Sequence, residues 1–187
     1  MVEDTSLATI HKVVAVKALS NKSGESFFDD LTLLEVSPPF KYRAHNEKRR
    51  GVTSVCLPEV DGKFNESKAD LVGFGNIGEF HNFPASSLMT AALDIIDIET
   101  CNRESRLKNP QIFNDEDKKK VVCASITNES KTACHGDSGG PLTVNRNGKV
   151  VQVGVVSASS ITGCGNRQTI FTSVTYYRNW IKDITGV

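Results

Sequence analysis

The chain has little of what a nucleic-acid-binding or membrane-spanning protein requires. Its 22 Lys and Arg residues are balanced by 22 Asp and Glu residues, so no excess of positive charge favours nucleic acid or an anionic membrane. No run approaches the roughly 20 apolar residues of a membrane-spanning helix. Residues 1–5 include two acidic residues and lack the basic-then-apolar order of a signal peptide. We expect no nucleic-acid partner and no membrane partner.

Histidine is scarce, and metal-ligand spacing is absent. The four histidines and five cysteines never fall at the intervals typical of a metal site. We therefore expect no metal and no cofactor. The sequence also has no internal repeat and no low-complexity linker, and its 187 residues are enough to bury a sizeable core.

Short β-branched segments separated by polar turns predict an all-β fold. Asn147-Gly148 is the clearest turn signal, since this dipeptide favours a tight hairpin. Apolar residues at helical spacing predict a helix over 174–184. The strands are expected at 10–16, 31–36, 70–74, 93–98, 142–144, 150–157 and 169–174.

The strongest chemical signal is the run Cys134 to Leu142, which reads C-H-G-D-S-G-G-P-L. A hydroxyl that attacks a carbonyl needs backbone N–H groups facing the oxyanion that it creates, and glycine lets the main chain approach closely. This pattern predicts that Ser138 is a nucleophile. The N–H groups of Gly136 and Ser138 are the expected oxyanion donors.

This run resembles the nucleophile loop of the trypsin/chymotrypsin family of serine proteases, and the resemblance extends in order over nearly the whole chain. It implies an all-β, chymotrypsin-like double β-barrel with a C-terminal helix and an incomplete first barrel. Residues 1–187 are expected to form one peptidase domain, with 1–58 a remnant of the first barrel and 59–187 the second barrel and helix. The implied function is a secreted, extracellular serine endopeptidase that acts on proteins or peptides through an acyl-enzyme on Ser138.

The resemblance also assigns an acidic residue and a serine to the active site. The segment 28–36 resembles the family strand whose aspartate orients the catalytic histidine, which makes Asp30 the expected triad aspartate. Asp29 is the alternative, because an aspartate at the start of a strand is often a turn or cap residue. Ser157 matches a family serine that bonds to the triad aspartate and borders the substrate groove.

Five cysteines leave one unpaired, and spacing alone does not decide the partners. The resemblance implies the disulfides Cys134–Cys164 and Cys101–Cys123. Cys56 resembles the cysteine that holds a segment preceding the catalytic domain in many family members. A free thiol of a cytosolic protein is the other interpretation of Cys56.

The catalytic histidine of the family is missing. The family supplies it from a T-A-A-H-C motif before the aspartate, and this sequence has no such motif. Thr90-Ala91-Ala92 is followed by Leu93 and lies after Asp30. None of the four available histidines matches the position of the motif: His11, His45, His81 and His135.

Two interpretations follow for the active state. The first is that the sequence begins too late, which explains together the absent histidine, the absent activation terminus and the odd Cys56. The alternative is a complete but catalytically dead homologue that acts as a binding or regulatory module. In the family a freshly cut N-terminal amine pairs with the aspartate before the nucleophile, here Asp137, which acts as a zymogen switch. Without that amine we expect Asp137 to point elsewhere, Gly136 N–H to be misaligned, and this polypeptide to have little peptidase activity.

The expected specificity pocket lacks a carboxylate. Thr132 stands six residues before Ser138, where tryptic family members carry an aspartate, so a basic side chain would be buried unpaired. Ser159 and Thr169 match positions that are glycine in wide pockets. We expect substrates with small or medium apolar P1 residues.

Overall fold

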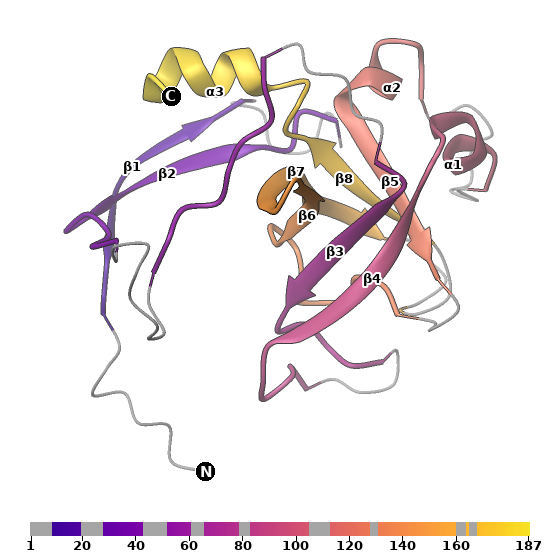
Figure 1. The fold of residues 1–187 in the computed structure, drawn as a ribbon, viewed down its shortest axis with the longest axis horizontal. Helices are drawn as coiled ribbons and strands as arrows, with labels where there is room; N and C mark the ends of the chain where they lie inside the picture. Colours follow the sequence, from indigo (N-terminus) through magenta and orange to yellow (C-terminus); the bar gives the residue numbers. More distant parts are fainter. Residues whose placement is uncertain are drawn as a thin grey trace.

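The computed structural model describes residues 9–19, 28–42, 52–60, 66–78, 83–104, 113–127, 131–159, 164 and 168–187. The described strands form a two-stranded sheet and a closed six-stranded barrel, and a helix ends the chain (Figure 1). The expected all-β architecture with a C-terminal helix is confirmed. The elements are β1 Lys12–Ala18, β2 Thr32–Ser37, β3 Lys68–Gly73, β4 Met89–Ile96, α1 Ile98–Glu104, α2 Asp117–Lys120, β5 Val121–Ile126, β6 Pro141–Arg146, β7 Lys149–Ser159, β8 Thr169–Ser173 and α3 Arg178–Thr185.

The barrel has the strand order β3-β4-β5-β8-β7-β6, and β6 pairs with β3 to close it. Every pairing is antiparallel. The expected hairpin joins β6 to β7, with Asn147 at φ 51° and Gly148 at φ 80°. Positive φ at both positions is the requirement of the tight turn that this dipeptide predicted. Closure leaves no unpaired edge on this sheet.

Inward-facing side chains of all six strands fill the barrel. Leu93, Leu142, Val153 and Phe171 are fully buried at its centre. Gly154 lies among these side chains, and a larger residue would not fit there because its Cβ would be 2.8 Å from Cβ of Phe171. Alternation of buried and exposed residues, as in β3, places these apolar residues on the inner face.

A second apolar cluster joins the β1–β2 sheet to the C-terminal helix. Leu31, immediately before β2, is buried with Val174, Tyr177 and Ile181. In Figure 1 the two-stranded sheet lies alongside α3. The helix ends where Gly186 adopts φ 78° and donates its N–H to the carbonyl of Lys182, a common C-terminal cap. This cluster packs the residue before β2 against α3 and against Val155 of the barrel strand β7.

Several expected boundaries were wrong. The strand expected over 93–98 ends at Ile96 because the Asp97 carboxylate accepts the Thr100 N–H at 2.8 Å and begins α1. The strand β5 and the short helices α1 and α2 were not expected. The expected helix over 174–184 begins only at Arg178, after a turn.

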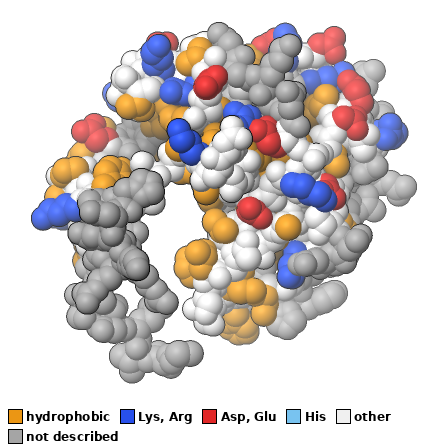
Figure 2. Space-filling model, in the orientation of Figure 1, with side chains coloured by type: hydrophobic (Ala, Val, Ile, Leu, Met, Phe, Trp, Pro, Cys, Tyr) orange, Lys and Arg blue, Asp and Glu red, His pale blue; other side chains and the backbone are white. Residues whose placement is uncertain are grey.

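The surface has no large region of one charge in the view of Figure 2, where Lys and Arg lie interspersed with Asp and Glu. Hydrophobic side chains gather at the lower end of the barrel in the same view. Exposed apolar residues on the segments that join β3 to β4 are Phe74, Ile77, Phe83 and Leu88. No helix in the described ranges is long and apolar enough to cross a membrane.

Candidate active site

Ser138 lies in the loop that leads from β5 to β6, and its side chain is exposed. Two glycines in this loop adopt conformations that favour glycine: Gly136 has φ 97° and Gly139 has φ 80°. The loop is tied to β7 by two backbone hydrogen bonds, Gly139 N–H to Val156 O and Val156 N–H to Gly140 O, both 2.9 Å. These bonds hold the backbone that follows Ser138 against β7.

Two backbone donors beside this hydroxyl are unused. In the part of the chain that the structure describes, no hydrogen bond uses the N–H of Gly136 or Ser138. The intervening Asp137 N–H, in contrast, donates to Cys134 O at 3.0 Å. Two unpaired N–H groups next to a nucleophilic oxygen are the chemical requirement for stabilising an oxyanion.

The structure brings Asp30 and Ser157 together. Ser157 Oγ donates to Asp30 Oδ2 at 2.7 Å, across 127 residues of sequence. Thr172 of β8 donates its hydroxyl to the main-chain carbonyl of Asp30 at 2.9 Å. Asp29 has different partners, Tyr177 and Lys120. The two neighbouring aspartates thus differ clearly in their surroundings, and Asp30 is the one whose carboxylate meets Ser157.

The Asp137 carboxylate is held by backbone donors. Its two oxygens accept the N–H of Gly75 at 2.8 Å and the N–H of Cys134 at 2.9 Å. Gly73 and Gly75 let it approach: a Cβ would lie 2.0 Å from a carboxylate oxygen at Gly73 and 2.5 Å at Gly75. These close contacts fix where the expected switch residue lies, at the end of β3.

A cavity of about 340 Å³ opens beside this carboxylate. Apolar side chains from β3 and β4, including Leu71 and Met89, form part of its wall, and Asp137 and Thr132 form another part. Lys131 also lines the cavity, which therefore combines an apolar wall with one carboxylate and one lysine.

The expected pocket residues lie at one end of β8. Thr132 Oγ1 is 2.7 Å from Thr169 Oγ1, and Thr169 is fully buried. Ser157 is half-buried in β7. Ser159 is also in β7, but its side chain lies outside the described part of the structure. The Thr132–Thr169 hydroxyl pair is partly buried and uncharged.

The cysteines form both disulfides that the resemblance implied, Cys101–Cys123 and Cys134–Cys164. The second anchors the nucleophile loop. Cys56 is an exposed free thiol, and its backbone pairs with β7 through Cys56 N–H to Val150 O and Gln152 N–H to Cys56 O. In the described ranges, no group of three or more His, Cys, Asp or Glu side chains could hold a metal.

The two histidines that the structure describes lie outside this constellation. His11 precedes β1; its Nδ1 lies 2.5 Å from Pro38 O, and its ring contacts Phe40. The His135 side chain is exposed, and its carbonyl accepts Asn76 N–H. His45 and His81 are outside the described residues.

The sequence analysis missed three residues near the site. Lys120 and Tyr177 contact Asp29, and Thr172 supports Asp30. Each is between 91 and 148 residues from its partner, so no local pattern reveals the pairing.

Comparisons with known proteins agree with this fold and site. The family model described as Trypsin matches residues 3–181, so the chain belongs to the trypsin family. It is 31% identical over 182 residues to "Transmembrane protease serine 11G" of Rattus norvegicus, which covers 96% of this chain and 40% of that protein. "Testisin" of Homo sapiens is 33% identical, covering 83% of this chain and 47% of testisin. "Urokinase-type plasminogen activator" of Gallus gallus is 30% identical, and the match covers 70% of this chain and 29% of that protein. The chain therefore spans less than half the length of these relatives.

Proposed function

We propose that this chain carries the nucleophile and substrate pocket of a serine endopeptidase. The observation that carries the proposal is that the N–H groups of Gly136 and Ser138, beside the exposed Ser138 hydroxyl, have no acceptor among the described residues. In this reaction the hydroxyl attacks the scissile carbonyl, the two N–H groups receive the oxyanion, and water later releases the acyl group. Asp30, held by Ser157, orients the imidazole that accepts the serine proton.

This sequence does not provide the catalytic histidine, the general base, at the position where the family has it. A serine hydroxyl is a poor nucleophile until a neighbouring base takes its proton. No T-A-A-H-C motif precedes Asp30, and neither His11 nor His135 contacts Ser138 among the described residues. We propose that this polypeptide alone has little or no peptidase activity and that a histidine-bearing segment makes it competent.

A catalytically inactive homologue that acts as a binding or regulatory module is the second candidate. The absence of the motif histidine favours it. The intact run Cys134 to Leu142 favours the protease, because binding alone does not require the nucleophile loop. Fold alone does not distinguish them, since one fold can host either function.

The pocket supports a preference for small or medium apolar P1 side chains. The Thr132–Thr169 hydroxyl pair would leave a buried Arg or Lys without a counter-charge. Ser159 is proposed to narrow the pocket further. Substrates are proposed to be extracellular proteins or peptides.

Two further features support a role in a longer assembly. The cavity beside Asp137 is lined by apolar side chains, one carboxylate and Lys131, and the Asp137 carboxylate is proposed to pair there with a newly cut N-terminal amine that bears an aliphatic side chain. The exposed Cys56 thiol is proposed to form a disulfide with a cysteine of another segment, as in many family members.

The experiment joins this chain to a first-barrel segment that carries T-A-A-H-C and measures hydrolysis of peptide amides with Ala, Val or Arg at P1. We expect cleavage after Ala and Val that disappears in Ser138→Ala and falls strongly in Asp30→Asn. Preferential cleavage after Arg would refute the pocket assignment. A folded hybrid that cleaves no peptide would favour the inactive homologue.

A further inference from the structure

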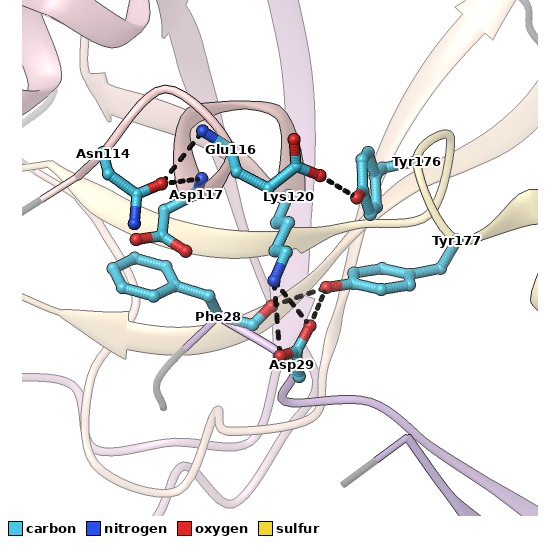
Figure 3. Close-up of polar contacts among 8 residues, drawn as sticks. All are labelled: Phe28, Asp29, Asn114, Glu116, Asp117, Lys120, Tyr176 and Tyr177. Atoms are coloured by element: carbon cyan, nitrogen blue, oxygen red, sulfur yellow. Dashed lines mark hydrogen bonds and ion pairs between the residues drawn. The ribbon is translucent and has the colours of Figure 1, made fainter. Parts of the chain in front are cut away.

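The segment that precedes β2 and carries Asp30 is held by one tyrosine at two points. The Tyr177 hydroxyl lies 2.9 Å from the carbonyl oxygen of Phe28 and 2.6 Å from Asp29 Oδ1 (Figure 3). Tyr177 is buried just before α3. The C-terminal turn therefore contacts both residues that precede Asp30.

Lys120 approaches the same carboxylate from α2. Its ammonium nitrogen is 3.2 Å from Asp29 Oδ1 and 3.4 Å from Oδ2. The Lys120 side chain is 18% exposed, whereas that of the neighbouring Lys119 is 65% exposed and pairs with Glu116. Figure 3 shows Lys120 and Tyr177 converging on Asp29 from separate elements. A partly buried ion pair is less screened by salt than the surface pair beside it.

The protonation states suit these contacts. The hydrogen bond from Tyr177, followed by Lys120, holds the pKa of Asp29 below its usual value. Burial, followed by the Asp29 hydrogen bond, raises the pKa of Tyr177 well above its usual value. The carboxylate therefore stays charged and the phenol stays protonated at neutral pH, although Asp117 and Tyr176 also face this cluster.

The contacts on either side of Asp30 restrict its main chain. Thr172 holds the Asp30 carbonyl, and Tyr177 with Lys120 holds the Asp29 side chain. The peptide group between Asp29 and Asp30 is itself held by a hydrogen bond of 3.1 Å from Leu31 N–H to Asp29 O. The direction of a side chain follows from its backbone dihedrals. Rotation of this peptide group would carry the Asp30 carboxylate away from Ser157.

We propose that Asp29, Lys120 and Tyr177 form a positioning cluster that aims the Asp30 carboxylate at Ser157. The inference rests on the proposed role of Asp30 as the orienting aspartate. Lys120 and Tyr177 are positioning residues, since they act through Asp29 and contact no reacting atom.

The test measures the carboxyl ¹³C resonance of Asp30 in the full chain labelled at aspartate, assigned with Asp30→Asn. Ser157→Ala removes the hydrogen bond directly and gives the reference shift. We expect Tyr177→Phe and Lys120→Met to move the resonance in the same direction, and Lys120→Arg to restore it. Tyr176→Phe and Lys119→Met are matched controls on the adjacent residues and should leave it in place.

Amide hydrogen exchange locates the effect. We expect exchange in β1 and β2 to rise by about tenfold in Lys120→Met and Tyr177→Phe, with barrel amides unchanged. An Asp30 resonance that stays fixed in Lys120→Met would overturn the proposal, as would an equal shift in Lys119→Met. The readout is independent of hydrolysis, so an inactive chain leaves the test intact.

Discussion

Replacing Gly75 by alanine tests the close approach of the Asp137 carboxylate to the backbone just after β3. The new Cβ would lie 2.5 Å from Cγ and Oδ2 of Asp137 and 2.6 Å from Oδ1. Favourable carbon contacts begin at about 3.5 Å, so the carboxylate must move by about 1 Å. That movement also breaks the 2.8 Å hydrogen bond from Gly75 N–H.

The expected cost follows from these two effects. Overpacking costs about 1–3 kcal/mol, and a lost hydrogen bond to a charged group costs about 1.5–3 kcal/mol. The two overlap because one movement relieves the clash and breaks the bond, so we expect Gly75→Ala to lower the free energy of unfolding by about 2–4 kcal/mol. When Asp137 is already replaced by alanine, the new methyl group at position 75 occupies the space that the carboxylate has left. The loss of unfolding free energy caused by Gly75→Ala should then fall below about 1 kcal/mol.

The assay is urea unfolding of the two single variants and the double variant with both disulfides intact. Gly140→Ala is the matched control, because its Cβ would lie 2.8 Å from the main-chain oxygen of Asp137, which Asp137→Ala retains. We expect a coupling of about 1.5–3 kcal/mol for Gly75 and almost none for Gly140. Additive effects of Gly75→Ala and Asp137→Ala would refute the assigned contact.

Three further predictions concern stability. Phe171→Ala empties the centre of the barrel, where the side chain is fully buried, and should lower the free energy of unfolding by about 3–5 kcal/mol in urea. Replacing Cys101 and Cys123 together by serine opens a disulfide of sequence separation 22 and should cost about 3 kcal/mol, seen as a lower urea midpoint than that of the oxidised parent. The lowered pKa of Asp29 means that its stabilising contacts are present above the ordinary value of 3.8 and are lost as pH falls through its lower folded value; the urea midpoints of the parent and Asp29→Asn should therefore differ at pH 6 and converge in acid.

Local sequence signals predicted some elements well. Asn147-Gly148 identified the β6–β7 hairpin because its positive φ values are a property of the dipeptide itself. The strand β5 was not predicted from the sequence; it follows the charged run of residues 115–120. The end of this charged run forms α2, where Lys119 pairs with Glu116 and Lys120 pairs with Asp29.

The site was predictable only in part. The glycine-rich run predicts Ser138 as the nucleophile, and the order of motifs predicts Asp30, whose carboxylate the structure places against Ser157. The contacts of Asp137 with Gly75 could not be predicted from sequence spacing, since the two residues are 62 positions apart. Such contacts depend on how the barrel closes.

The most direct test of the central claim is labelling of Ser138 with a fluorophosphonate, followed by mass spectrometry of the modified peptide. The account predicts that this 187-residue chain is labelled little or not at all, and that the hybrid with the histidine-bearing segment is labelled at Ser138 and not in Ser138→Ala. Rapid labelling of Ser138 in the chain alone would contradict the account, because it would require a base that neither the motif nor the described histidines supply.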